Sequence, residues 1–157
     1  MDPEIPSART APVVGPEAGP VTETVLIRVP ADPDYLGVIR SATAHVATKL
    51  GCTLSEVSDL RLAVDEACGL LLRNTVRDRP GAGVNGADGA GDLECRFVLD
   101  GTGALRVALS LDGRDGARPD ADEFGWTILA ALVDDIVWQA DGPTVRVEIL
   151  KHRTAGR

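Results

Sequence analysis

One helical segment, running from Asp59 to Leu70, constrains the fold of this sequence more than any other part. Apolar residues recur in it at three- and four-residue spacing, which is typical of a helix with one buried face. The pattern places a single acid, Glu66, among small and apolar neighbours, and one turn later on the same row stands Leu70. A carboxylate between apolar neighbours is partly desolvated, which favours a proton-accepting role. A polar partner at position 70 would complete such a site, and leucine cannot supply it.

Glu66 also has a plainer interpretation. Charged residues are common on the solvent face of a helix, so the pattern alone favours a surface acid at this position. The neighbouring Asp65 is expected to face solvent.

Composition limits the classes of protein to which this chain can belong. The length of 157 residues suits one domain, and 44% hydrophobic residues with a mean hydropathy of +0.03 indicate a globular chain. The formal net charge of −8 argues against direct nucleic-acid binding, because phosphates are bound by Lys and Arg. No apolar run is long enough to cross a bilayer, and no signal peptide is visible. Three scattered cysteines fit a reducing compartment, so a cytoplasmic location is expected.

The chain is expected to divide into three parts. Residues 1–23 are rich in Pro, Ala and small polar residues and lack periodicity, which predicts a disordered N-terminal tail. Residues 24–151 carry alternating strand and helix patterns and form the expected domain. Residues 152–157 are expected to be a frayed C-terminal tail.

The order of patterns within the domain predicts the fold class. Gly51 ends a first helix, and either Thr53 or Ser55 can cap a second, with Glu56 three residues after Thr53 in a capping-box pattern. Short turns join the later strands as hairpins, so we expect a two-layer α+β sandwich with a mostly antiparallel sheet and helices on one face. The expected strands are 24–30, 93–99, 105–111, 136–140 and 144–150, and a third helix is expected at 126–135.

Other candidate features are weaker. Arg40, on the first expected helix, is either a solvated charge or a contact for a protein partner, because arginine is enriched at interface hot spots. The run from Phe124 to Trp126 stands at a loop-to-helix junction, where exposed amides bind anions, although most helix starts bind only their own caps. Histidines and cysteines do not cluster at metal-ligand spacing, so no metal site of their own is expected.

The runs DLRLAVDEAC at 59–68 and EFGWTILAALVDDI at 123–136 resemble the RsbW-type anti-sigma factors of the histidine-kinase-like (GHKL) ATPase superfamily. The likeness is greatest to the divergent high-GC bacterial branch that includes the UsfX-type proteins, and it covers residues 25–150. It implies a GHKL, or Bergerat-like, ATPase fold. It also implies a cytosolic regulator that binds an alternative sigma factor and keeps it from RNA polymerase.

The resemblance further implies partners and an activity. Active members bind Mg-ATP, phosphorylate a serine of a STAS-domain anti-anti-sigma factor, and commonly act as homodimers. By its spacing before Glu66, Arg40 corresponds to the family arginine that contacts both partners. Three functions stay open at this point: an anti-sigma factor that works by binding, an active serine/threonine protein kinase, and a nucleotide-sensing module that gates another partner.

Carried over residue by residue, the family's first nucleotide box is incomplete in this chain. Glu66 matches the Glu that acts as base. Leu70 stands where an Asn holds the Mg ion, and leucine cannot ligate a hard cation that requires oxygen ligands. Asn74 falls where many relatives have a His.

The second and third boxes are altered as well. Asp112 and Gly116 match the adenine-binding Asp and the last Gly of the second box, but Arg114 replaces its middle Gly. Gly125 is the retained Gly of the third box, which wraps the phosphates, and Trp126 follows it. Binding of ATP and Mg is therefore doubtful, with Glu66 as the one expected catalytic residue and no expected protein ligand for a metal.

Overall fold

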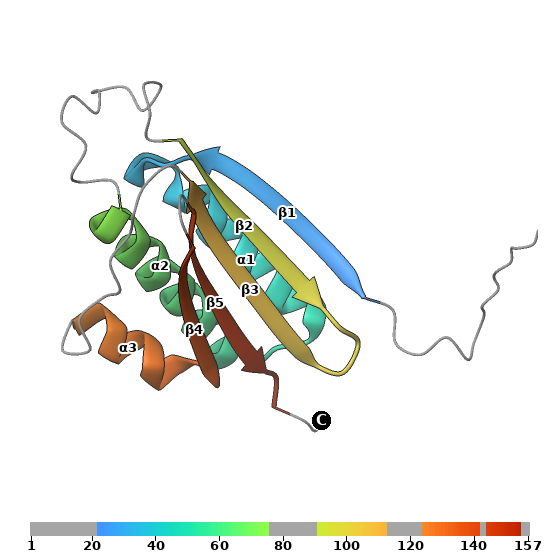
Figure 1. Ribbon diagram of the computed structural model, residues 1–157. Coiled ribbons are helices and arrows are strands. Elements are labelled where there is room, and N and C mark those ends of the chain that lie inside the picture. Colours follow the sequence, from blue (N-terminus) through green and yellow to red (C-terminus); the bar gives the residue numbers. More distant parts are fainter. Residues whose placement is uncertain (1–21, 76–90, 113–123, 142–143, 155–157) are drawn as a thin grey trace, which may run out of the picture.

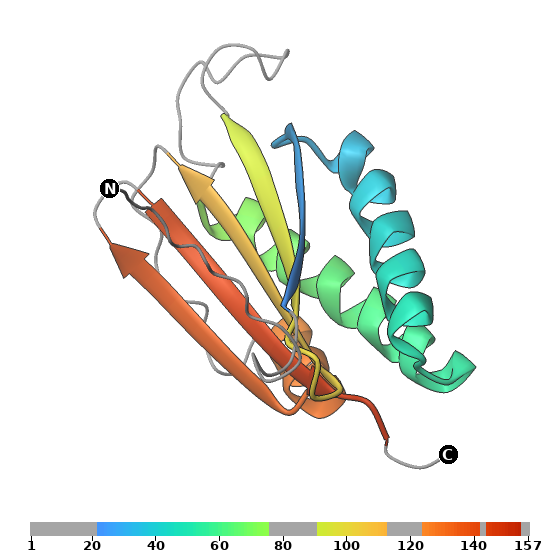
Figure 2. The ribbon, with the colours of Figure 1, turned by 90° about the vertical axis from the view of Figure 1, so that its right-hand side faces the viewer.

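The computed structural model describes residues 22–75, 91–112, 124–141 and 144–154. They form a two-layer α+β sandwich in which the helices cover one face of a five-stranded sheet (Figures 1 and 2). The expected order of elements and the fold class are thereby confirmed. The elements are β1 (Glu23–Pro30), a short 3-10 turn η4 (Pro33–Tyr35), α1 (Leu36–Leu50), α2 (Leu54–Thr75), β2 (Asp92–Leu99), β3 (Ala104–Asp112), α3 (Phe124–Leu132), β4 (Asp135–Asp141) and β5 (Thr144–His152).

The sheet has the strand order β1-β2-β3-β5-β4, and every neighbouring pair is antiparallel. The pairing of β3 with β5, with Leu109 opposite Val147, joins segments that α3 and β4 separate in sequence. The last hairpin thereby adds to the edge of the first, and α3 lies beside α2 beneath β4 and β5 (Figure 1).

The predicted helix boundaries between α1 and α2 are confirmed by their hydrogen bonds. Gly51 adopts a left-handed φ of 94° and ends α1. The Thr53 N–H donates to Glu56 Oε1 at 2.8 Å, and the Glu56 N–H donates to Thr53 Oγ1 at 3.1 Å. This reciprocal pair satisfies two amides at the start of α2 and fixes the turn between the two helices.

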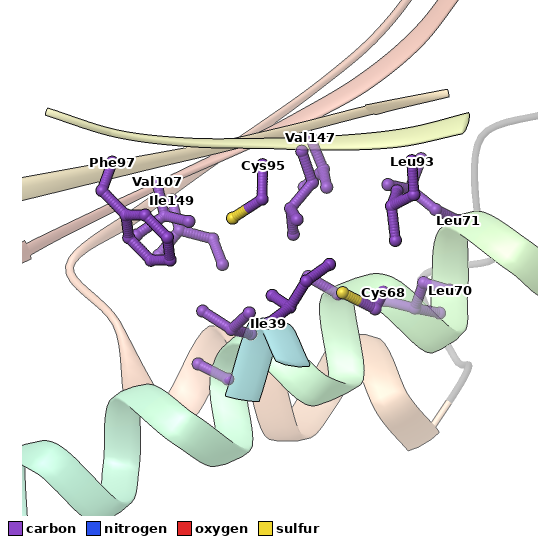
Figure 3. Close-up of a cluster of buried hydrophobic side chains, with 14 of the residues drawn as sticks. Ile39, Cys68, Leu70, Leu71, Leu93, Cys95, Phe97, Val107, Val147 and Ile149 are labelled. Carbon is purple, nitrogen blue, oxygen red and sulfur yellow. The ribbon is translucent and has the colours of Figure 1, made fainter. Parts of the chain in front are cut away.

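The core lies between the sheet and the main apolar stripe of α2 (Figure 3). Alternate residues of β2 and β5 are buried against the helices, as the period of two in a strand requires. Cys68 of α2 belongs to this core, and burial raises the pKa of its thiol to about 12, so it packs as a small apolar residue. The α2 residues buried here include Leu60, Val64, Ala67, Cys68 and Leu71.

The third helix differs from the prediction. It was expected at 126–135, whereas α3 begins at Phe124 and ends at Leu132. The helix ends early because the Asp134 N–H donates to the carbonyl oxygen of Leu150 at 2.9 Å, which starts the pairing of β4 with β5. Residues 133–135 fit a helical pattern, but pairing with β5, which is distant in sequence, takes them out of the helix.

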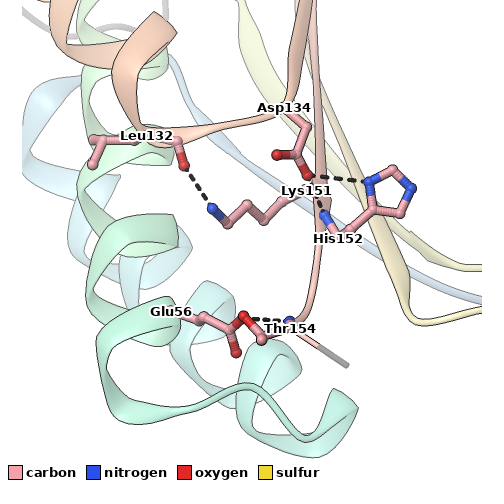
Figure 4. A network of polar contacts seen from close by, with 6 residues as sticks. All are labelled: Glu56, Leu132, Asp134, Lys151, His152 and Thr154. Carbon is pink, nitrogen blue, oxygen red and sulfur yellow. Dashed lines mark hydrogen bonds and ion pairs between the residues drawn. The ribbon is translucent and has the colours of Figure 1, made fainter. Parts of the chain in front are cut away.

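The end of β5 and the residues that follow it are held by side-chain hydrogen bonds, whereas a frayed tail was expected from residue 152 (Figure 4). Lys151 Nζ donates to the carbonyl oxygen of Leu132 at 3.1 Å, and the His152 N–H donates to Asp134 Oδ2 at 2.6 Å. The Thr154 N–H donates to Glu56 Oε2 at 2.5 Å, and the Thr154 hydroxyl donates to the same oxygen. Ordered contacts thus continue through residue 154, while residues 155–157 and 1–21 lie outside the described ranges.

We predict that Glu56 makes unfolding dependent on acid pH. Hydrogen bonds from the Thr154 hydroxyl and the Thr53 N–H lower the pKa of Glu56 to about 2. A carboxylate with a depressed pKa adds stability above its unfolded pKa of about 4.3, and this stability is lost as pH falls toward the folded value. The free energy of unfolding from urea titrations should therefore decrease between about pH 5 and pH 2.

Two variants isolate this effect. Glu56→Gln keeps an acceptor but cannot titrate, so its unfolding free energy should depend less on pH over the same range. Glu56→Ala removes the cap and the tie to Thr154, and should cost about 1–3 kcal/mol at pH 7. An unchanged acid profile in Glu56→Gln would contradict this assignment.

Candidate functional site

The helix α2 packs against both α1 and α3, so its two flanks present different chemistry. Successive helix residues are about 100° apart. Asp65 bonds to Arg40 of α1, while Glu66 lies against the first turn of α3. The acid expected at a nucleotide site and the arginine expected at a partner surface therefore lie on opposite flanks of one helix.

On the α3 flank, Gly125 allows the two helices to approach closely. Gly125 is buried, and a methyl group added at this position would lie 2.8 Å from Glu66 Oε1 and 3.5 Å from Leu70 Cδ2. A separation of 2.8 Å is too short for a real methyl group, so the absence of a side chain permits the contact. The retained glycine of the expected phosphate-wrapping box thus packs directly on the expected base.

Leu70 is fully buried beneath this contact, with none of its surface exposed. Glu66 is half-buried, and Leu62, at the other end of the same row, is 45% exposed. The row formed by residues 62, 66 and 70 is therefore covered only toward its C-terminal end. Burying a leucine side chain contributes about 1.5–3 kcal/mol, so Leu70 strengthens the packing of α3 on α2.

The sequence interpretation missed Arg73. A methyl group at Gly69 would lie 2.9 Å from Arg73 Nη1, and one at Gly125 would lie 3.1 Å from Arg73 Nη2. The guanidinium therefore reaches from α2 to the start of α3. The signal was present in the spacing, because a residue seven positions after Glu66 is displaced by only about 20° around a helix, whereas one eight positions later, Asn74, is displaced by about 80°.

The other expected nucleotide residues are only partly described. Asn74 lies in the last turn of α2, and Asp112 ends β3 opposite Thr144 in the register, but their side chains are not described. Gly116 lies outside the described residues. Within the described ranges, no three His, Cys, Asp or Glu side chains gather to hold a metal ion. Of the expected nucleotide residues, the structure brings Glu66 and Gly125 into contact.

On the α1 flank, Arg40 is held by Asp65. Its Nη2 and Nε donate to Asp65 Oδ1 at 2.9 and 3.2 Å, with the side chains 40% and 35% exposed. Asp65, which was expected to face solvent, is partly exposed and also pairs with Arg40, because the packing of α1 on α2 brings an arginine to it. The pair fixes the direction of the Arg40 side chain and leaves part of its guanidinium accessible.

An open pocket of about 230 Å³ lies beside this ion pair. Leu62 contributes an apolar wall, and Leu54, two turns earlier on α2, is 87% exposed. Exposed apolar side chains around an arginine are typical of protein interfaces. The residues that line the pocket are Arg40, Ser58, Arg61, Leu62 and Asp65.

Comparison with known families gives a match over most of the chain. Residues 29–149 match the model of the histidine kinase-like ATPase domain. This chain belongs to the histidine kinase-like ATPase domain family. The matched range includes α2, α3 and all five strands in whole or in part, so the contact between Glu66 and Gly125 lies inside the family domain.

Several relatives within the family are similar to this chain over much of their length. The serine-protein kinase RsbW of Bacillus licheniformis is 31% identical over 145 residues, covering 81% of this chain and 85% of that protein. The anti-sigma-F factor RsbW of Mycobacterium tuberculosis is 28% identical over 134 residues, covering 83% and 69%. A stronger local match, 48% identity with the serine-protein kinase RsbW of Bacillus subtilis, spans only 26% of that protein.

A solved structure supports the histidine kinase-like ATPase fold. The crystal structure of the RsbU and RsbW domains of Rv1364c from Mycobacterium tuberculosis superposes with a TM-score of 0.63 at 14% identity. The similarity covers 85% of this chain and 33% of that one. Within the described part of the chain, no helix combines the length and apolar character needed to cross a membrane.

We predict that Gly125→Ala displaces the ends of the Glu66 and Arg73 side chains and destabilises this family domain by about 1 kcal/mol, at the lower end of overpacking costs because flexible side chains can move aside. The matched control is Gly37→Ala in α1, where a methyl group would meet nothing within 4 Å. This control should stabilise the protein by about 0.5–1 kcal/mol through helix propensity. Urea unfolding of both variants measures the difference, and equal effects would contradict the close contact.

Proposed function

We propose that this chain is an anti-sigma factor that binds and sequesters an alternative sigma factor, opposed by a STAS-domain anti-anti-sigma factor, and that it works in the cytoplasm by binding rather than by phosphoryl transfer. Membership of the histidine kinase-like ATPase domain family supports the scaffold. The similarity to a relative named anti-sigma-F factor supports the partner class. The domain assigned to this activity spans residues 24–151.

The observation that carries the proposal is the burial of Leu70. The resemblance places the Mg-binding Asn at this position. The Leu70 side chain is instead apolar and fully buried, and its Cδ2 would lie 3.5 Å from a methyl group added at Gly125. Mg²⁺ requires near-octahedral oxygen ligands. Of the three side chains found at this contact, one is a carboxylate, one a leucine and one an arginine, and this set does not fit a divalent metal.

The proposed partner surface is centred on Arg40, on the other flank of α2. Its ion pair with Asp65, the neighbouring pocket and the exposed Leu62 combine charge with apolar area. Partly desolvated arginines of this kind contribute strongly to protein association. The partner surface and the altered nucleotide site use different residues, so loss of one is compatible with retention of the other.

The alternative is an active serine/threonine protein kinase. It is favoured by the retained Glu66 and by the similarity to the serine-protein kinase RsbW of Bacillus licheniformis. A kinase requires bound Mg-ATP, so calorimetry with Mg-ATP separates the two functions. Binding of ATP without affinity for sigma or STAS-domain proteins would instead indicate a nucleotide-sensing module.

The resemblance also implies a homodimer. Measurement of the molecular mass in solution would test it.

We predict that the purified chain binds an alternative sigma factor of its host and gives no heat of binding with Mg-ATP. Arg40→Ala should weaken sigma binding at least about tenfold, because it removes the charged centre of the surface. Arg28→Ala is the matched control, since Arg28 pairs with Glu94 on the sheet. The Arg28 variant should bind like the wild type.

Two results would overturn the proposal. Failure to bind any alternative sigma factor of the host would refute the anti-sigma function. Transfer of phosphate from ATP to a STAS-domain protein, abolished by Glu66→Ala, would establish the kinase instead.

A further inference from the structure

Three side chains from successive turns of α2 meet the first turn of α3. They are the acidic Glu66, the apolar Leu70 and the basic Arg73. A methyl group added at Gly125 would lie 2.8 Å from Glu66 Oε1, 3.5 Å from Leu70 Cδ2 and 3.1 Å from Arg73 Nη2. The carboxylate and the guanidinium thus both lie within about 3 Å of one point, on either side of a fully buried leucine.

Two glycines make room for this arrangement. Arg73 folds back along its own helix, with Nη1 2.9 Å from the methyl position of Gly69, and reaches across to Gly125. A side chain at either glycine would occupy space that the guanidinium now uses. The position of Arg73 therefore depends on a glycine in each helix.

The charges at this contact complement each other. The start of α3 carries a partial positive charge, which favours the Glu66 carboxylate beside it. The Arg73 guanidinium brings a full positive charge to the same region, since its Nη2 also lies close to the methyl position of Gly125. Arg73 thus places a permanent positive charge where a metal-binding relative would hold its cation.

We propose that Arg73 is a specificity-determining residue: its guanidinium is a built-in cation that joins α2 to the start of α3 beside Glu66 and excludes a divalent metal from this position. This role of Arg73 rests on the proposed function, in which the chain acts without Mg-ATP. It adds to that function the identity of the group that replaces the metal. It follows that restoring the metal-binding Asn at position 70 is insufficient, because the arginine still repels the metal.

The first experiment tests whether Arg73 joins the two helices. Hydrogen exchange of α3 amides should be at least about tenfold faster in Arg73→Gln than in the wild type, with a melting temperature lower by about 3 °C. Arg73→Lys, which keeps the charge, should recover most of both effects. Arg61→Gln is the control, because Arg61 is an exposed arginine of α2 that lies at the pocket on the α1 flank.

The second experiment tests the exclusion of metal, with MgCl2 alone as the probe and KCl of equal ionic strength as reference. The wild type and Leu70→Asn should show no Mg²⁺-specific change in melting temperature. Leu70→Asn/Arg73→Gln should melt about 3 °C higher in saturating MgCl2 than in KCl.

Specific results would overturn the inference. One is a Mg²⁺-specific rise in melting temperature that is equal in Leu70→Asn and in Leu70→Asn/Arg73→Gln. The other is hydrogen exchange of α3 amides that is as slow in Arg73→Gln as in Arg61→Gln. If the buried asparagine prevents folding, the exchange comparison of Arg73→Gln, Arg73→Lys and Arg61→Gln decides alone, because these variants change exposed side chains. Neither experiment measures sigma binding, so failure here is distinguishable from failure of the proposed function.

Discussion

The burial of α2 is the constraint on which the rest of the structure depends. Its main stripe packs on the sheet, Asp65 pairs with α1, and Glu66, Leu70 and Arg73 meet α3. A helix fixed on three sides has little freedom to rotate, because core packing is dense and any rotation would break several contacts together. Both candidate functional regions take their geometry from this one element.

The contact between α2 and α3 combines close helix packing with the residues of the proposed, altered nucleotide site. The resemblance predicts a nucleotide site in this region, and an apolar side chain and a guanidinium lie there beside Glu66. Burying a leucine side chain lowers the free energy of the folded protein. An asparagine buried in the same place without a ligand would lose its hydrogen bonds to water and destabilise the fold. A leucine at position 70 therefore stabilises the packing of this contact, and it offers no oxygen ligand to a metal.

The first turn of α2 is held both by its own capping box and by the residues after β5. The capping box of Thr53 and Glu56 fixes its first turn, and Thr154 bonds to the same Glu56 carboxylate. The exposed Leu54 and the pocket residue Ser58 follow immediately. The segment after β5 therefore supports the part of α2 that presents the proposed partner surface, although it lies far away in the sequence.

The sequence by itself determined the elements, the fold class and the family likeness. Periodicity, Gly51 and the capping box act through neighbouring residues, so they can be read locally. The acid at Glu66 and the missing polar group at Leu70 were visible for the same reason.

Only the tertiary structure decided which side chains meet. Asp65 was expected to face solvent, and the packing of α1 paired it with Arg40. Helical spacing placed Arg73 near the line of Glu66, but its contact depends on the approach of Gly125 from a helix more than fifty residues away. The early end of α3 followed from strand pairing with Leu150. These outcomes depend on contacts between distant segments, which the pattern of a single segment does not contain.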